Sequence, residues 1–236
     1  LEHQFCGQAP QHVINTITSQ YRSHRSKTIT GSGERDTLDY ILGLAEIVYP
    51  QYCEFWHYDD HNITWIEREA KFKLNYEFPT HEGQRQVTLR GMRDGIYSYG
   101  STYGVFETKT KSKIIEKDII ANLHADMQTM MYCFCTYLST GKYPNEVKYN
   151  VIRRPDVYRR KNEPLHPYLQ RVKEDIKSRP EFYFMRYTAA ITSSDIQHFV
   201  AKTLNPVLAL FVQWYDSVKK NPVGSERFQS PYHFLN

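Results

Sequence analysis

The sequence has few cysteines, no long hydrophobic run and only a small excess of one charge. Four cysteines in 236 residues are too few for a disulfide framework, so we expect a reducing, intracellular compartment. No apolar run approaches the roughly 18 residues of a membrane-spanning helix, and residues 1–4 lack the start of a signal peptide. We therefore expect no membrane partner. The chain also begins without Met, which predicts a fragment or a processed product.

What is present is a globular composition with a mild basic excess. Apolar residues make up 40% and charged residues 24%, a balance that supports a folded core. Thirty Lys and Arg against 26 Asp and Glu give a net charge of +4. This charge is compatible with a polyanionic partner but does not demand one.

The first half of the chain predicts a helix followed by an antiparallel meander. Apolar residues recur at helical spacing from Asp36, a plausible N-cap, to Trp56, after a polar loop over 23–35. Alternation then predicts strands over Thr64–Phe78, over 86–92 after a turn at 83–86, and over Tyr103–Thr108. Ile96, Tyr97 and Tyr99 continue the second strand. Short turns between them favour antiparallel pairing.

The second half changes period and predicts a mixed arrangement. We expect a long amphipathic helix over Lys113–Thr140, ended by Gly141, and a strand over Glu146–Ile152 that is parallel because a helical crossover precedes it. Helices over Pro167–Ser178 and Ser193–Lys219 flank a further strand, Phe182–Thr188. The fold class is α/β, with a helical extension over 1–62, a core over 63–153 and a mainly helical part over 154–236, in one domain.

One stretch of the meander carries a candidate chemical site. Asp94 ends one predicted strand, and Glu107 and Lys109 share a face of the next because they are two residues apart. A hairpin brings Asp94 beside them, and two converging carboxylates suit Mg²⁺ or Mn²⁺. A lysine on that face can orient or deprotonate a water. The alternative is a solvated edge strand formed by Glu107, Lys109, Lys111 and Lys113.

The following helix adds a polar stripe. His124, Gln128 and Tyr132 are spaced four residues apart and lie on one helix face beside the apolar stripe. A helix packed across the meander places this stripe near Asp94 and Glu107, although ordinary surface packing produces such stripes too.

These residues together resemble the PD-(D/E)XK nuclease superfamily, and within it the RecB-like nucleases, including lambda-type, CRISPR-associated and phage enzymes. The likeness rests on Gly91-Met92-Arg93-Asp94, then Glu107-Thr108-Lys109, then a helix with Gln128 and Tyr132 in Gln-x-x-x-Tyr spacing. It covers roughly residues 65–153. It implies a restriction-endonuclease-like core, a central mixed sheet flanked by helices, in the cytoplasm of a bacterium or a phage-infected host cell.

The resemblance also implies roles for the individual residues. Asp94, Glu107 and the backbone carbonyl of Thr108 would bind Mg²⁺ or Mn²⁺ as the cofactor, and Lys109 would position the attacking water. Gln128 and Tyr132 would orient Lys109 or the DNA backbone. The implied activity is hydrolysis of DNA phosphodiester bonds, with an exonuclease in recombination, repair or phage DNA processing as the first expectation. A structure-selective or restriction-type endonuclease and a catalytically idle DNA-binding module are the alternatives, and a homo-oligomer is left open.

Two family features are not matched. Many RecB-like nucleases carry a metal-binding His in a Gly-x-x-x-His pattern, which we do not find, and such a residue would then precede Leu1. His57 and His61 are alternative ligands, although a solvated break at 57–62 is the simpler interpretation. No cysteine follows Cys135, so no iron–sulfur cluster is expected, and Cys133 and Cys135 are interpreted as packing residues.

Basic residues favour DNA as the partner, because such charges neutralise phosphates. They lie beyond the proposed metal ligands and after the fourth predicted strand; the alternative for the second group is a solubilising loop. The candidate DNA-binding residues are Lys111, Lys113, Arg153, Arg154, Arg159 and Arg160.

Overall fold

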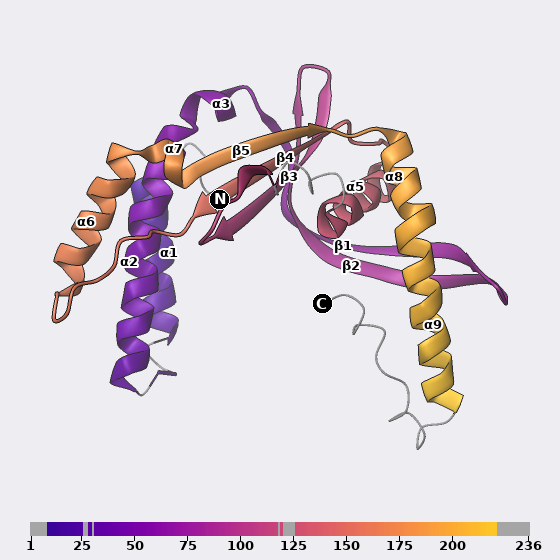
Figure 1. Ribbon diagram of the computed structural model, residues 1–236, viewed down its shortest axis with the longest axis horizontal. Coiled ribbons are helices and arrows are strands. Elements are labelled where there is room, and N and C mark those ends of the chain that lie inside the picture. Colours follow the sequence, from indigo (N-terminus) through magenta and orange to yellow (C-terminus); the bar gives the residue numbers. More distant parts are fainter. Residues whose placement is uncertain (1–8, 26–27, 30, 118, 120–125, 221–236) are drawn as a thin grey trace.

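The computed structural model describes residues 9–25, 28–29, 31–117, 119 and 126–220 (Figure 1). None of the helices in these ranges is long and apolar enough to cross a membrane. The helices are α1 (Pro10–Arg25), α2 (Ser32–Phe55), α3 (His57–His61), α5 (Met127–Thr140), α6 (Leu165–Ser178), α7 (Pro180–Tyr183), α8 (Ser193–Phe199), the π-helical η2 (Val200–Leu204) and α9 (Asn205–Lys220). The strands are β1 (Thr64–Thr80), β2 (Gly83–Tyr99), β3 (Thr102–Lys111), β4 (Glu146–Arg153) and β5 (Phe184–Ala190).

The five strands form one mixed sheet in the order β1-β2-β3-β4-β5. β1, β2 and β3 are an antiparallel meander, β4 is parallel to β3, and β5 is antiparallel to β4. The predicted α/β class, the meander and the parallel fourth strand are therefore confirmed. Figure 1 shows α1, α2 and α6 on one side of the molecule, and α5, α8 and α9 on the other.

Several predicted boundaries were wrong. Helix α2 begins at Ser32 rather than at Asp36, and residues 57–61 form the short helix α3 instead of a plain break. Residues 180–183 are helical, so β5 begins at Phe184. The strands also run past their predicted ends. β2 starts at Gly83, inside the expected turn, β3 continues to Lys111, and β1, β4 and β5 end one or two residues later than predicted.

The predicted continuous helix over 113–140 is interrupted, although residues 116, 117 and 119 are helical as expected. Residues 113–115 are not helical, and Asp126 has an extended backbone (φ −64°, ψ 111°) that caps a new helix, α5. The predicted end is confirmed, since Gly141 adopts the left-handed conformation (φ 72°) after Thr140. His124, the first residue of the predicted polar stripe, lies outside the described residues.

Two apolar clusters hold the elements together. One joins the sheet to α5 and α8, and Cys133 and Cys135 are buried in it, as predicted for packing residues. Burial raises the pKa of both thiols to about 12, so neither is an activated nucleophile. The second cluster joins α2, α6 and α7 to β5 through residues such as Tyr52, Val172 and Phe184.

The sheet divides in the middle of β2, and this division creates the site. β2 pairs with β1 over nearly its whole length, but its pairing with β3 covers only Gly95–Tyr99 against Thr102–Phe106. Beyond Phe106, β3 pairs with β4 alone. We call the place where β2 and β3 separate the fork.

Side-chain alternation in β2 resets at the fork. Arg93 hydrogen-bonds to side chains of α5, so it points to the α5 face. Gly95, two residues on, faces the other side, because an added Cβ would lie 2.4 Å from the Trp65 ring. In β1, Glu69 has a φ of 46°, which is uncommon for a residue with a side chain. A local irregularity in both strands therefore sets the direction of Asp94.

Candidate active site

Asp94 occupies the fork. Its carboxylate Oδ2 accepts a hydrogen bond from the backbone N–H of Thr108 at 2.7 Å, which replaces the strand pairing lost beyond Gly95 and Phe106. The prediction that Asp94 ends its strand was wrong, since β2 continues to Tyr99. The expected proximity to the Glu107–Lys109 segment is nevertheless present.

Glu107 is the buried acid of the site. Its residue is 1% exposed, its carboxylate forms an ion pair with Lys109, and Oε2 has no hydrogen-bond partner among the described residues. Burial raises its pKa to about 7, the ion pair with Lys109 opposes that rise, and the negative charges of Asp94 and Asp126 add to it. Glu107 is thus poised between its two protonation states near neutral pH.

The polar residues of α5 extend this ion pair into a chain. Lys109 Nζ donates to Gln128 Oε1 at 2.5 Å, and Gln128 Nε2 donates to the Tyr132 hydroxyl at 2.8 Å. The Tyr132 ring also packs edge-on against Phe72. Strand alternation and helical spacing placed these residues correctly, because α5 packs across the face of the sheet that carries Glu107 and Lys109.

Asp126 is a residue of the site that the sequence interpretation missed. Its side chain caps α5, accepting from the Gln128 N–H at 3.3 Å and from Thr129 Oγ1 at 2.6 Å. Its charge raises the pKa of Glu107 and, less than burial does, that of Tyr149. Asp at the start of a helix is a recognised N-cap signal, but the expectation of one helix from residue 113 concealed it.

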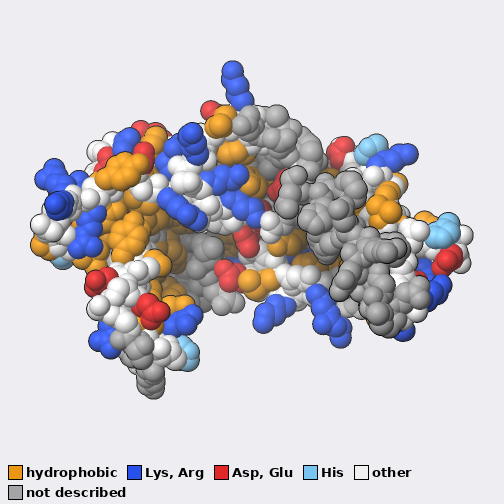
Figure 2. All heavy atoms as spheres, turned by 60° about the horizontal axis from the view of Figure 1, so that its bottom comes forward, with side chains coloured by type: hydrophobic (Ala, Val, Ile, Leu, Met, Phe, Trp, Pro, Cys, Tyr) orange, Lys and Arg blue, Asp and Glu red, His pale blue; other side chains and the backbone are white. Residues whose placement is uncertain are grey.

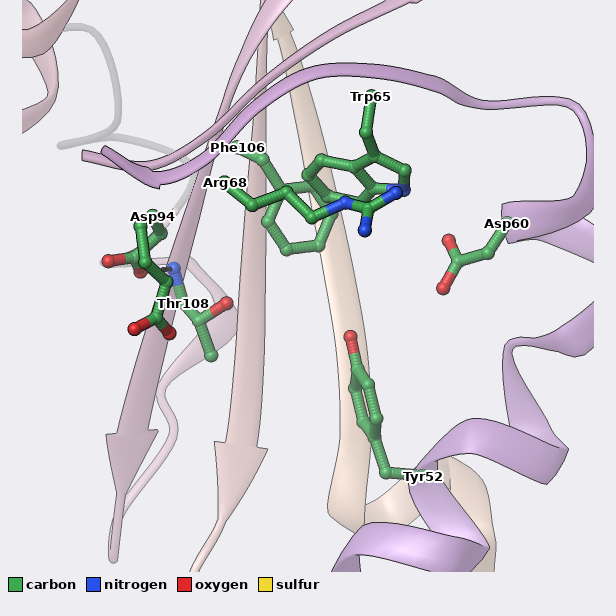
Figure 3. Close-up of a pocket in the computed structure, with 8 residues that line it drawn as sticks. Tyr52, Asp60, Trp65, Arg68, Asp94, Phe106 and Thr108 are labelled. Carbon is green, nitrogen blue, oxygen red and sulfur yellow. Dashed lines mark hydrogen bonds between the residues drawn. The ribbon is translucent and has the colours of Figure 1, made fainter. Parts of the chain in front are cut away.

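Behind Asp94 and Thr108, on the face away from α5, a narrow pocket leads to a buried ion pair that was also missed. Figure 3 shows Asp94 and Thr108 at one end of this pocket and Tyr52 and Asp60 at the other. Arg186 of β5 contacts Asp60 through two hydrogen bonds, at 2.5 and 3.0 Å, and donates to Asn150 at 3.1 Å.

This buried network reaches the site strand. The Asn150 side-chain amide donates to Thr108 Oγ1 at 3.4 Å, and the Arg186 guanidinium lies 4.1 Å from the Trp56 ring centroid. Asp60 is committed to Arg186, so the stretch between His57 and His61 is a structural element joined to the sheet.

The donor set partly meets the requirements of a divalent cation. Among the described residues, no three His, Cys, Asp or Glu side chains converge as a ready metal cluster. Asp94 accepts a hydrogen bond from the Thr108 N–H, and Glu107 forms an ion pair with Lys109. The charges of Asp94 and Asp126 raise the pKa of Glu107, but the three carboxylates do not converge as a metal cluster. The unpartnered Oε2 of Glu107 and the oxygen-only donors fit Mg²⁺ or Mn²⁺.

The candidate DNA-binding residues fall into two groups. Lys111 ends β3 and Lys113 lies beyond it, exposed, so the alternative of one strand that carries Glu107, Lys109, Lys111 and Lys113 is not formed. Arg153 is half-buried and stacks on the Phe182 ring at 4.0 Å. The remaining three candidate residues, Arg154, Arg159 and Arg160, are exposed.

Comparison with known proteins gives no family for the chain. No protein-family profile matches it, and no curated protein matches it at a significant level. Among solved structures, the crystal structure of SSO0001 is 13% identical, covers 74% of this chain and 88% of its own, and has a TM-score of 0.28.

Proposed function

We propose that the protein is a metal-dependent deoxyribonuclease that hydrolyses phosphodiester bonds, with exonuclease activity as the first expectation. The observation that carries this proposal is the chain of contacts from buried Glu107 through Lys109 and Gln128 to Tyr132, beside Asp94 in the fork. A solvated edge strand does not explain a glutamate that is 1% exposed. These are also the residues by which the sequence resembles RecB-like nucleases.

The resemblance supplies a role for each residue of the site, and the contacts support it. Asp94 and Glu107, with the carbonyl of Thr108, would hold Mg²⁺ or Mn²⁺. The bound ion would polarise a scissile phosphate and lower the pKa of a water. Lys109 has three N–H donors, and its partners among the described residues, Glu107 and Gln128, occupy two of them. The third would serve a water or a phosphate oxygen.

Gln128 and Tyr132 act on Lys109 rather than on the phosphate directly. The side-chain amide of Gln128 accepts from Lys109 through its oxygen and donates to the Tyr132 hydroxyl through its nitrogen. These two hydrogen bonds orient the Lys109 ammonium group before a substrate binds. Such preorganised charge is what stabilises negative charge developing on a phosphate.

The decisive experiment compares linear and circular DNA with EDTA, Mg²⁺ or Mn²⁺ in the buffer. We expect degradation of linear DNA only with metal, and little change in covalently closed circles. Nicking or linearisation of the circles would identify an endonuclease instead. Equal cleavage in EDTA would refute the metal dependence, and DNA binding without any cleavage would refute the nuclease proposal.

A further inference from the structure

The loop over residues 154–164, which joins β4 to α6, exposes an aromatic side chain to solvent. Tyr158 is 85% exposed, and the adjacent Arg159, Arg160 and Lys161 are exposed as well. A tyrosine ring this exposed buries almost no apolar area within the chain, so its packing contributes little to the fold.

The loop is nevertheless held in a defined conformation. Arg171 of α6 forms two hydrogen bonds to the Glu163 carboxylate, at 2.9 and 2.6 Å, and donates to the backbone carbonyl of Tyr158 at 3.1 Å. Glu163 also accepts from the Arg160 N–H at 2.9 Å, and its backbone carbonyl accepts from Arg159 Nε at 2.7 Å. The hydrogen bonds from Arg171 to the carboxylate, and then that from the Arg160 N–H, lower the pKa of Glu163 to about 2. The backbone around Tyr158 is fixed while its ring stays in solvent.

The loop begins where the strand of the candidate active site ends. Lys111 is the last residue of β3, and its carbonyl accepts a hydrogen bond from the Arg154 N–H at 2.8 Å. A hydrogen bond thus joins the end of β3, which carries Glu107 and Lys109, to the first residue of the loop. In Figure 1 the loop continues from β4 towards α6, on the side of the molecule that carries α2.

Four cationic side chains of the loop lack an ion-pair partner among the described residues. Arg154, Arg159, Arg160 and Lys161 form no ion pair in the described part of the protein. Figure 2 shows Lys and Arg side chains gathered over the half of the molecule that contains α6. Cations without an ion-pair partner, gathered on one loop, are complementary to a polyanion.

We propose that loop 154–164 binds single-stranded nucleic acid, with the ring of Tyr158 stacking on a base and Arg159 and Arg160 contacting the neighbouring phosphates. A single strand is the ligand that satisfies both features, because its bases offer free faces while its backbone offers charge. In a duplex the base faces are covered by their neighbours. The idea that the loop guides a strand to Glu107 and Lys109 rests on the proposed nuclease function. Binding of a single strand by the loop does not require cleavage.

The test measures binding of the full chain in EDTA, by fluorescence anisotropy with a labelled oligothymidine of about 20 nucleotides, several times the footprint of one loop. We expect Tyr158→Ala to weaken binding about tenfold, within the range for losing one base–aromatic stack. Tyr158→Phe keeps the ring and should bind like the wild type. Tyr58→Ala is the matched control, because Tyr58 is also 85% exposed but lies on α3.

Arg160→Ala should weaken binding by an amount that shrinks as salt is raised, whereas the effect of Tyr158→Ala should persist. Unchanged binding by Tyr158→Ala, or an equal loss with a duplex of the same length, would overturn the inference. So would a loss of binding by Tyr58→Ala as large as that by Tyr158→Ala. Thermal melts of each variant establish that it is folded.

The two proposals fail separately. A Tyr158-dependent loss of binding by a protein that never cleaves DNA would support the loop and refute the nuclease. Metal-dependent cleavage with wild-type binding by Tyr158→Ala would do the reverse.

Discussion

At the scale of single residues, Glu107 combines deep burial with an incomplete set of partners. Lys109 binds one side of its carboxylate, and Oε2 has no hydrogen-bond partner among the described residues. Burial and the neighbouring acids raise its pKa to about 7, from 4.5 for an ordinary glutamate. In the folded protein the neutral acid is therefore favoured relative to the unfolded chain.

We expect Glu107→Gln to stabilise the metal-free protein at pH 8 while abolishing cleavage. Because the pKa of Glu107 is raised, the neutral acid contributes its full stabilisation below about pH 4.5. This contribution is lost as the pH rises through about 7. Glutamine cannot ionise, so the gain at pH 8 should be about 1 to 3 kcal/mol in the free energy of unfolding, reduced by the lost ion pair. Urea unfolding at pH 5 and pH 8 measures this; a destabilised variant at pH 8 would contradict it.

Lys109 and Lys111 lie two residues apart on β3 but differ in their contacts. Lys109 is bonded to Glu107 and Gln128, whereas Lys111 ends the strand. We expect Lys109→Ala to lower turnover about 100-fold or more at saturating DNA, the range for a positioned acid–base or electrostatic group.

Lys111→Ala is the matched control for this prediction. It should chiefly raise the DNA concentration needed for half-maximal rate, and added salt should diminish that effect. Steady-state rates at several salt concentrations separate the two variants. Equal loss of turnover in both would show that the contact with Gln128 does not single out Lys109.

At the scale of elements, α5 depends on the capping residue that precedes it. The Asp126 carboxylate accepts hydrogen bonds from the Gln128 N–H and from the Thr129 hydroxyl. The same helix carries the Gln128 side chain that accepts from Lys109. We expect Asp126→Ala to lower the free energy of unfolding by about 1 kcal/mol, because an N-cap acceptor is lost. Asp126→Asn keeps an oxygen that accepts from the Gln128 N–H but replaces the oxygen that accepts from Thr129, so it should lose less stability than Asp126→Ala.

Urea unfolding followed by circular dichroism measures both Asp126 variants. The asparagine variant also removes a charge near Glu107 while keeping the hydrogen bond from the Gln128 N–H, so its cleavage rate should depend on pH differently from that of the wild type. Wild-type stability in Asp126→Ala would show that the cap does not support α5.

At the scale of the whole molecule, the ion pair of Asp60 with Arg186 joins the N-terminal helices to the far edge of the sheet. Both side chains are 7% exposed, and α3 contributes one while β5 contributes the other. We expect Asp60→Ala to lower the free energy of unfolding by about 3 to 5 kcal/mol, because it leaves a buried guanidinium without its carboxylate.

The adjacent Asp59 provides the control for the whole-molecule prediction. It is exposed, so Asp59→Ala should change stability by about 0.5 kcal/mol or less. Thermal and urea unfolding of the two variants make the comparison. A small effect in Asp60→Ala would show that the N-terminal helices are not coupled to the sheet through this pair.

The sequence by itself determined those features that depend on local periodicity. Alternating side chains specified the meander, and the change to helical spacing specified the packed part of α5, with Gly141 at its end. Spacing alone also placed Glu107 with Lys109 on a strand and Gln128 with Tyr132 on a helix. Each of these inferences needs only residues a few positions apart, whose relative directions are fixed by backbone geometry.

Only the tertiary structure decided the features that depend on distant partners. β2 separates from β3 where the Asp94 carboxylate accepts a hydrogen bond from the Thr108 N–H. The alternation of apolar and polar residues does not mark that point. Asp60 and Arg186 are 126 positions apart and read separately as ordinary surface charges. Burial depends on the folded chain, because distant elements must pack together before a side chain is removed from water. The sequence alone therefore does not show which charged groups are buried, or which contacts offset the cost of burying them.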